Sequence, residues 1–304
     1  MPEPSPTVDP DADTGETRVI AGRYELRRVL GSGGMGVVYE AENTWTQRRV
    51  AVKVLPPDRA LDPKQIERFM QEARTASALR HPNIIDVLDM GQDGADGSLY
   101  IVLELLEGED LRTQLEREEK LSSERALAIV EPVLRGLAAA HTAGVVHRDI
   151  KPANVFLTRA LDGAPLPKLI DFGVARRLAP GDDRARTLTG VTVGTPAYMA
   201  PEQLRAERTI GPPADVWAVG VMLHEMLTGE TPFPSDNYNV LVHRVLSGER
   251  PSIAAAHPEL PATLCAVLER CLEPAPSKRY ADAGALLAAL QGRDVAPTMP
   301  PSSS

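Results

Sequence analysis

The sequence is poor in aromatic and in basic residues. Only 4% of its 304 residues are Phe, Trp or Tyr, so the core must consist mainly of Leu, Val, Ile and Ala. Lys and Arg number 33 against 42 Asp and Glu, which gives a net charge of −9. Because nucleic acids and anionic membranes bind to basic surfaces, this charge argues against both as partners.

Cysteine is almost absent, with Cys265 and Cys271 as the two examples. They lie six positions apart in a segment with a helical pattern, which turns their side chains to different faces. A disulfide between them is therefore excluded, and we expect two core thiols in a reducing compartment. His141, His224, His243 and His257 lack the spacing of metal ligands, so packed or solvated side chains are expected there.

No apolar run reaches the roughly 18 to 20 residues that span a bilayer. The best candidate, VWAVGVMLHEML at 216–227, carries His224 and Glu225 and is predicted to be a buried core helix. The N-terminus is acidic and proline-rich, where a signal peptide needs a basic and then an apolar stretch. These absences predict a cytoplasmic protein with no membrane span in this chain.

The chain does contain an ordered region between two tails that are predicted to be disordered, 1–21 and 293–304, because both lack periodicity. A small sheet with one helix is expected to precede a larger helical half. Strands are predicted at 23–30, 36–42 and 48–55, a helix at 62–80, two further strands ending near 108, and helical runs at 123–142, 214–228 and 261–290.

The stretch GSGGMGVV at 31–38 has the spacing GxGxxG, through Gly31, Gly33 and Gly36. This pattern either opens the helix of a dinucleotide-binding fold or forms a hairpin over ATP. The first alternative needs a helix at once and an acidic residue about 20 positions on. Here strand-forming residues follow, and Lys53 stands where the acid is needed. The hairpin is favoured, and a glycine hairpin without a ligand stays an alternative.

A site for a polyanion needs close backbone approach, which glycine permits, and a fixed cation, which Lys53 can supply. On the predicted helix at 62–80, Glu72 falls on the flank of the apolar stripe, whereas Glu67 points nearly opposite. Glu72 is therefore the carboxylate that can face inward.

The most specific pattern is HRDIKPANV at 147–155, followed by DFG at 171–173. With the glycine stretch and Lys53, these segments resemble the protein kinase family. GTPAYMAPE, DVWAVG and SKRY extend the resemblance over residues 23–290. It implies the α+β class and a bilobal fold, with a small antiparallel-sheet N-lobe containing one main helix and a larger, mostly helical C-lobe. The implied domain is 22–292, with an N-lobe at 22–104, a hinge at 104–110 and a C-lobe at 111–292.

The resemblance also implies the catalytic groups. Asp149 would accept or orient the proton of the attacking hydroxyl, and Lys151 would neutralise the transferring phosphoryl group. Asn154 and Asp171 would bind Mg²⁺, with Mn²⁺ as an alternative ion.

ATP is the implied nucleotide, with Lys53 paired to Glu72 and holding its phosphates. Glu104 and Leu106 would offer backbone groups to adenine, while Leu103 limits the back of the pocket. The full set of ATP-binding candidates is Leu30, Gly31, Ser32, Gly33, Gly34, Met35, Gly36, Val38, Ala51, Lys53, Glu72, Leu103, Glu104 and Leu106.

The substrate class follows from the same resemblance. Lys151, two residues after Asp149, and Thr195 in GTPAY resemble serine/threonine kinases rather than tyrosine kinases. The overall pattern looks most like the eukaryotic-like (Hanks-type) serine/threonine protein kinases of bacteria. The expected activity is transfer of the ATP γ-phosphate to Ser or Thr hydroxyls of protein substrates. A pseudokinase scaffold and a small-molecule kinase of similar fold are the alternatives.

Structural and regulatory roles are implied as well. Glu202 and Arg279 are expected to form a buried ion pair, and Asp215 and Trp217 are expected to be structural. Arg148, Arg68 and Arg176 would form a cationic cluster that a phosphate can neutralise. The candidate phosphosites in the activation loop are Thr187 and Thr189, with Thr192 as a neighbour.

Other partners follow from these expectations. A homodimer for autophosphorylation is left open, as are phosphothreonine-binding modules that read Thr14, Thr17 or Thr298 in the tails. Since the chain ends soon after the kinase-like region, a receptor role is not expected.

Overall fold

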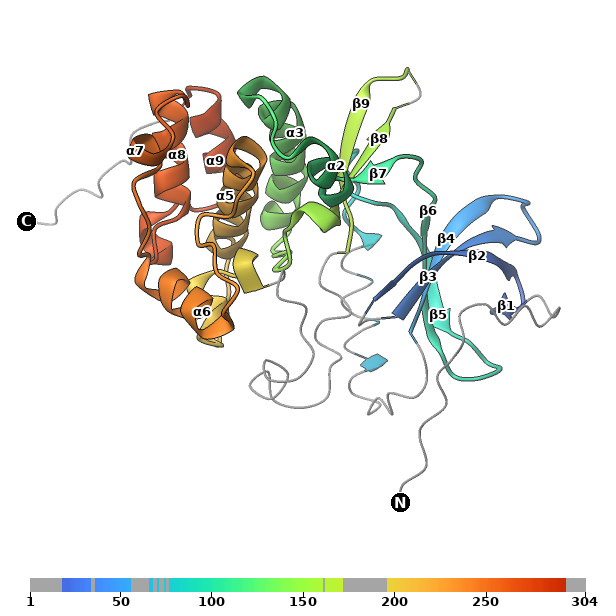
Figure 1. Cartoon of the computed structure of the whole chain (residues 1–304). Helices are drawn as coiled ribbons and strands as arrows, with labels where there is room; N and C mark the ends of the chain where they lie inside the picture. The colour runs from blue at the N-terminus through green and yellow to red at the C-terminus, as the bar shows by residue number, and fades with distance from the viewer. Residues whose placement is uncertain are drawn as a thin grey trace, which may run out of the picture. The chain divides into compact units, whose positions relative to one another are not determined.

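The computed structural model describes residues 18–33, 36–55, 66–67, 70, 74, 77–160, 162–171 and 196–293. Contacts divide the chain into two compact units. The first is drawn from Met1–Arg59 and Asp89–Leu105, and the second from Ala60–Leu88 and Leu106–Ser304. The first contains a β-sheet, and the second contains mostly helices (Figure 1).

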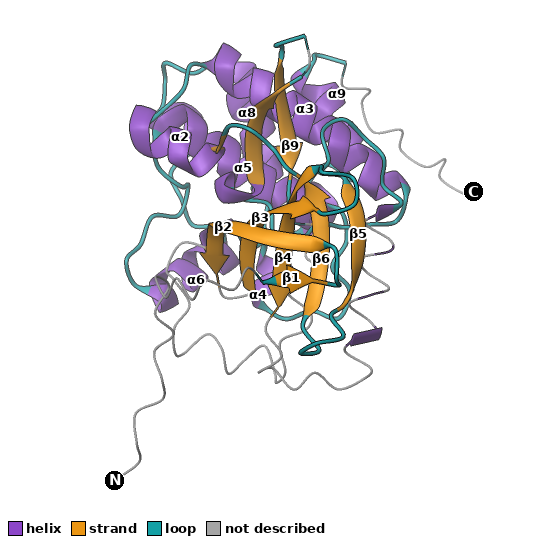
Figure 2. Ribbon diagram, turned by 90° about the vertical axis from the view of Figure 1, so that its right-hand side faces the viewer, coloured by secondary structure: helices purple, strands orange, loops and turns teal. Residues whose placement is uncertain are grey.

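The described strands of the first unit join in one sheet, in which the segments Val19–Ile20 and Arg49–Leu55 are rich in β-branched residues (Figure 2). Strands β1 to β4 pair antiparallel with their sequence neighbours, and β4 also pairs antiparallel with β6. The strands predicted at 23–30, 36–42 and 48–55 are confirmed as β2, β3 and β4. In spatial order the strands are β1 (Val19–Ile20), β2 (Tyr24–Gly33), β3 (Gly36–Asn43), β4 (Arg49–Leu55), β6 (Leu99–Glu104) and β5 (Val87–Gln92).

Strand β4 is buried on both of its faces. Val50, Val52 and Val54 belong to an apolar cluster on one face. Because side chains alternate along a strand, Ala51 and Lys53 lie on the other face. The alternation therefore fixes Lys53 on the side of the sheet that does not carry this cluster.

The second unit carries helices and a small antiparallel sheet in the order β7-β8-β9. Its strands are β7 (Glu109–Asp110), β8 (Val155–Arg159) and β9 (Pro165–Leu169). Its helices are α2 (Leu111–Glu118), α3 (Ser123–Thr142), α4 (Pro201–Leu204), α5 (Pro213–Thr228), α6 (Tyr238–Ser247), α7 (Ile253–Ala256), α8 (Ala262–Cys271) and α9 (Ala283–Leu290), with short 3₁₀ turns η1 (Pro152–Asn154), η3 (Pro196–Tyr198) and η4 (Pro276–Lys278).

Helix α5 is the centre of the second unit and packs against α3, α8 and α9 (Figure 1). Every residue from Ala214 to Leu227 is buried, which confirms the predicted core helix. Trp217 stacks on Phe233 with ring centroids 5.6 Å apart. Gly229, with φ of 86°, ends the helix in a left-handed conformation that glycine adopts without strain. Over the residues that the structure describes, no helix is both long and apolar enough to cross a bilayer.

The helical run predicted at 261–290 is two helices, so that part of the prediction is wrong. Helix α8 ends at Cys271, and α9 begins at Ala283. Pro274 and Pro276 lie between them and cannot continue a helix, because proline lacks the amide donor. Both cysteines are buried and free on α8, as expected.

Residues 79–88 belong by their contacts to the second unit, although the sequence places them in the predicted lobe of 22–104. The Asn83 amide donates to the Pro167 carbonyl at 2.8 Å. Ile85 N–H donates to the Leu169 carbonyl, and Leu169 N–H donates to the Asn83 carbonyl, each at 2.9 Å. These hydrogen bonds tie the segment to β9.

Candidate active site

The loop at 147–155 connects α3 to β8, and its backbone is held by Asp215 of α5. This buried carboxylate accepts the His147 N–H and the Arg148 N–H, each at 2.8 Å. Asp215 is 1% exposed, and a buried carboxylate is stable only when its oxygens are hydrogen-bonded. Asp215 therefore has the structural role expected from the sequence, which is to anchor the loop.

His141 of α3 contributes a third contact to Asp215, at 3.0 Å from its Nε2 atom. Its Nδ1 atom accepts the Ala283 N–H at 3.2 Å. Because Nδ1 is an acceptor, the ring proton lies on Nε2 and is donated to Asp215. The sequence pattern gave His141 no such role, since Asp215 and Ala283 are 74 and 142 positions away.

The Asp149 carboxylate is held by two neighbours from its own loop. Lys151 Nζ donates to its Oδ2 atom at 2.9 Å. Asn154 Nδ2 donates to the same oxygen at 3.0 Å and to the Asp149 carbonyl at 2.7 Å. The three residues predicted to be catalytic therefore form one hydrogen-bonded group in the second unit.

His147 connects Asp149 to the residue before Asp171. Its Nδ1 atom accepts the Asp149 N–H at 3.3 Å, and its Nε2 atom donates to the Ile170 carbonyl at 3.1 Å. Burial lowers the pKa of His147, which favours this neutral form. Ile170 N–H in turn donates to the Asn154 carbonyl at 3.0 Å. Asp171 is thus fixed next to the loop at 147–155, with a left-handed φ of 57°.

The oxygen atoms of Asn154 and Asp171 suit a hard divalent cation. Asn154 uses its amide nitrogen on Asp149, which leaves its Oδ1 atom as the group that can accept a metal. Asp171 presents an exposed carboxylate. No group of three or more His, Cys, Asp or Glu side chains with metal-binding geometry occurs among the described residues. A nucleotide-bound Mg²⁺ needs only one or two carboxylates, because it keeps waters and phosphate oxygens as ligands.

In the first unit, several nucleotide candidates share one face of the sheet. Lys53 is register-paired with Val38 on β3, and Ala51 is register-paired with Leu103 on β6. Directly paired residues point to the same side, so Val38, Ala51, Lys53 and Leu103 line one face. Lys53 is 8% exposed.

Of the glycine stretch, Leu30, Gly31, Ser32 and Gly33 end β2, and Gly36 begins β3. Gly36 has φ of 129°, and a Cβ atom there would overlap the Val54 carbonyl oxygen. Only glycine fits that position without strain.

For the remaining candidate site residues the structure gives less detail. Glu104 is the last residue of β6, whereas Leu106 belongs to the second unit. Residues 66, 67, 70, 74 and 77 of the predicted helix at 62–80 are helical. The candidates Gly34, Met35, Glu72, Thr187 and Thr189, together with Arg68 and Arg176, lie outside the described residues.

Glu202 and Arg279 form the expected buried ion pair. The two guanidinium nitrogens meet the two carboxylate oxygens at 2.8 and 2.9 Å, and the side chains are 4% and 0% exposed. The guanidinium also donates to the carbonyls of Glu273, Pro213 and Pro274. The N–H groups of Nε and of both terminal nitrogens of Arg279 are therefore all used in hydrogen bonds.

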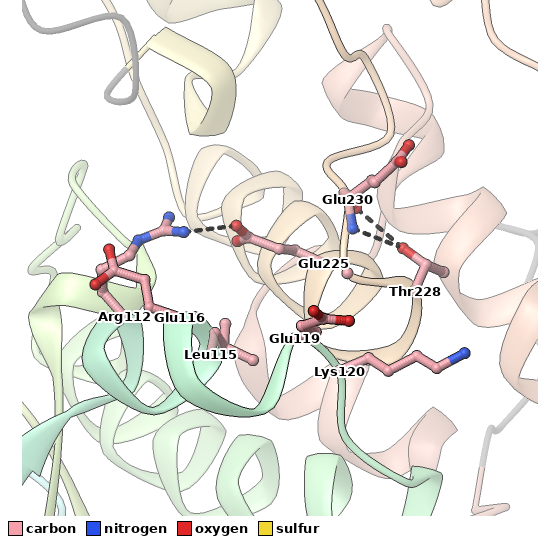
Figure 3. Close-up of a pocket in the computed structure, with 9 residues that line it drawn as sticks. Arg112, Leu115, Glu116, Glu119, Lys120, Glu225, Thr228 and Glu230 are labelled. Carbon is pink, nitrogen blue, oxygen red and sulfur yellow. Dashed lines mark hydrogen bonds and ion pairs between the residues drawn. The ribbon is translucent and has the colours of Figure 1, made fainter.

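A further polar group joins α2, η3 and α5. Glu225 accepts a hydrogen bond from the Tyr198 hydroxyl at 2.5 Å and one from Arg112 at 2.9 Å. Arg112 also donates to the Tyr198 hydroxyl. Burial raises the pKa of Tyr198, so the hydroxyl keeps its proton. A pocket beside Arg112 and Glu225 is lined by nine residues, of which four are glutamates, including Glu230 (Figure 3).

Comparison with known proteins gives the family. A model described as the protein kinase domain matches residues 24–289. The chain belongs to the protein kinase family. This confirms the resemblance read from the motifs and the expected α+β kinase fold.

Bacterial kinases are among the relatives of this kinase-family chain. It is 39% identical over 276 residues to serine/threonine-protein kinase PknH of Mycobacterium tuberculosis. This match covers 91% of this chain and 42% of the relative. The chain is 38% identical over 288 residues to serine/threonine-protein kinase pkn3 of Myxococcus xanthus, covering 94% and 52%. The chain spans about half the length of the curated relatives that it matches.

A solved kinase domain is similar as well. The crystal structure of a mutant of the Mycobacterium tuberculosis PknI kinase domain aligns with a TM-score of 0.69 and 30% identity. The alignment covers 91% of this chain and 97% of that one.

Proposed function

We propose that this chain is a protein serine/threonine kinase, which transfers the γ-phosphoryl group of ATP to Ser or Thr hydroxyls of proteins. The observation that supports this most strongly is the Asp149 carboxylate, held by Lys151 and Asn154 and joined through His147 to the residue before Asp171. The names of the relatives, which are serine/threonine-protein kinases, support the same substrate class.

In the proposed reaction Asp149 accepts or orients the proton of the substrate hydroxyl as the oxygen attacks the γ-phosphorus. The bond from phosphorus to the bridging oxygen of ADP breaks as the new bond forms. The protein itself takes little part in the covalent chemistry, so catalysis depends mainly on positioning and charge. Lys151, whose Nζ lies 2.9 Å from Asp149, places a cation where negative charge spreads over the phosphoryl oxygens.

A divalent cation belongs to this proposal, and Mg²⁺ is the ion that the oxygen donors favour, with Mn²⁺ as an alternative. Asn154 and Asp171 would hold it. When bound, it neutralises charge on the phosphate oxygens.

Binding of ATP is proposed for the face of the sheet that carries Lys53. Lys53 would contact the phosphates, while Val38, Ala51 and Leu103 would line the adenine pocket. Gly31, Gly33 and Gly36 would let backbone amides approach the phosphates. A partner for Lys53 in Glu72, and adenine contacts from Glu104 and Leu106, remain predictions.

The test is incubation of the purified chain with radiolabelled ATP, Mg²⁺ and myelin basic protein, with the Asp149→Asn variant in parallel. We expect label on Ser and Thr of the chain or of the added protein, and at least about a hundredfold less in the variant. Absence of label on both proteins, with ATP binding retained, would support a pseudokinase scaffold. Absence of protein label with consumption of ATP on small hydroxyl compounds would support a small-molecule kinase.

Regulation and location are proposed on the sequence alone. Autophosphorylation at Thr187 and Thr189 would add negative charge where Arg148, Arg68 and Arg176 are expected to gather. A homodimer for that reaction, phosphothreonine-binding modules as partners, and a signalling role remain predictions. A cytoplasmic location fits the two free cysteines.

A further inference from the structure

Gln203 of α4 contacts the catalytic loop, a role that no motif of the sequence indicates. Its Nε2 atom donates to the Arg148 carbonyl at 2.9 Å. Its Oε1 atom accepts the Ala200 N–H at 3.0 Å. The donor and acceptor ends of the amide are therefore both used, which fixes its orientation. The contact spans 55 positions of the sequence and joins α4 to the loop.

The carbonyl that Gln203 holds belongs to a strained residue. Arg148 has φ of 65°, in the left-handed region that residues other than glycine rarely occupy. Such a conformation persists only where neighbours hold it. Asp215 accepts the Arg148 N–H from one side, and Gln203 donates to the Arg148 carbonyl from the other. The Arg148 N–H belongs to the peptide that joins His147 to Arg148, whereas the carbonyl that Gln203 holds belongs to the peptide that joins Arg148 to Asp149. The N–H of this second peptide is donated to His147 Nδ1.

Gln203 is itself mounted on a rigid support. The preceding residue, Glu202, is locked in the buried ion pair with Arg279. The Ala200 N–H that fixes the Gln203 amide lies at the start of the same helix. Because the Glu202 side chain is held by Arg279 and the Gln203 Oε1 atom is held by the Ala200 N–H, the amide can hold the Arg148 carbonyl without moving itself.

We propose that Gln203 is a positioning residue for Asp149, acting through the carbonyl of Arg148. This inference rests on the proposed catalytic role of Asp149. Gln203 keeps the peptide between Arg148 and Asp149 from rotating. The orientation of this peptide sets the position of the Asp149 Cα atom, from which the side chain extends. A small misplacement of a reacting group can cost about a hundredfold in rate, so the contact bears on turnover rather than on binding of ATP.

The Gln203→Glu variant tests the contact most directly. It keeps the size of the side chain and an oxygen for the Ala200 N–H, but it replaces the donor with an oxygen that faces the Arg148 carbonyl. Gln92→Glu is the matched control, since Gln92 at the exposed end of β5 donates its Nε2 to the Gly97 carbonyl at 3.0 Å. Gln203→Met is the second variant, because it is neutral and similar in length, in case the new carboxylate destabilises the fold.

The measurements are kcat and KM for ATP with myelin basic protein, together with the melting temperature. We expect kcat to fall at least about tenfold in Gln203→Glu and in Gln203→Met, with KM for ATP within about twofold and the melting temperature within about 3 °C. Gln92→Glu should keep the wild-type kcat. A merely structural role would lower the melting temperature and leave kcat per folded molecule unchanged.

Wild-type kcat in both Gln203 variants, in a chain whose activity depends on Asp149, would overturn this inference and leave the proposed function intact. A fall in kcat that matches the loss of folded protein would overturn it too. A wild-type chain without activity would overturn the proposed function, and this role with it.

Discussion

At the scale of single residues, the second unit is held by buried polar side chains whose hydrogen bonds are satisfied over long sequence distances. Asp215 accepts from His147, Arg148 and His141, and the Arg279 guanidinium is surrounded by Glu202 and backbone carbonyls. Such groups contribute little net stability when complete, but removal of one partner leaves a costly buried charge.

The Glu202→Gln substitution should therefore destabilise the fold strongly. It leaves the Arg279 charge, whose side chain is 0% exposed, without its carboxylate. We expect the free energy of unfolding to fall by about 3 to 5 kcal/mol, measured by urea denaturation. The matched control is Glu109→Gln, which removes one of the two carboxylate partners of the exposed Arg117 and should lower the free energy of unfolding much less than Glu202→Gln does. An equal loss of unfolding free energy in the two variants would show that burial of the Glu202–Arg279 pair does not determine the effect.

Stability should also fall as the pH drops below neutral. Burial lowers the pKa of His224 from its ordinary value, as it does for His147 and His81. Below about pH 6.5 the unfolded chain binds protons that the folded chain does not, so unfolding becomes more favourable. Above about pH 6.5 these histidines cause no loss of stability. Below it the loss grows as the pH falls, until the pH reaches the lower pKa values that the histidines have in the folded chain.

Urea denaturation at pH values from about 7.5 to about 5.5 measures this effect. The His224→Gln variant keeps an amide that can donate to the Glu230 carbonyl, which His224 Nδ1 contacts at 2.8 Å. The variant should show a shallower decline of unfolding free energy with falling pH than the wild type. An identical decline would show that His224 does not contribute.

At the scale of elements, the hairpin of β2 and β3 contains two glycines, Gly33 and Gly36, for which we expect different roles. Gly36 needs its positive φ and its lack of a side chain, because a Cβ atom would overlap the Val54 carbonyl of β4. Gly33 ends β2 and is register-paired with Gly36 at the tip of the hairpin. The two positions should therefore respond differently to substitution.

Valine at each position tests this difference. Gly36→Val should lower the melting temperature of the protein as well as its use of ATP, because the backbone must shift to admit the side chain. Gly33→Val should raise KM for ATP more than it changes the melting temperature, since the backbone there is proposed to approach the phosphates. Thermal denaturation and steady-state kinetics measure the two effects. Equal loss of fold and of ATP use in Gly33→Val would make that glycine structural.

At the scale of the whole molecule, the sequence predicted the parts that are contiguous. The run 147–155 brings Asp149, Lys151 and Asn154 together within one loop, so spacing alone was enough to group them. The strands of the first unit followed from short β-branched segments bounded by glycine or polar turns.

Other features could not be predicted because they depend on contacts between distant segments. Gln203 meets Arg148 across 55 positions, and His141 meets Ala283 across 142. No local sequence pattern marks either of these two contacts. The break between α8 and α9 was visible as prolines, yet the apolar period on both sides concealed it.

The central claim is that the Asp149 group makes this chain a kinase for Ser and Thr. A mass-spectrometric map of phosphate on the purified protein, after incubation with ATP and Mg²⁺ and beside Asp149→Asn, tests it most directly. We expect phosphate on Ser or Thr, with Thr187 and Thr189 among the sites, and none gained by the variant. No phosphate gained by the chain or by an added protein substrate, or an equal gain in Asp149→Asn, would contradict it.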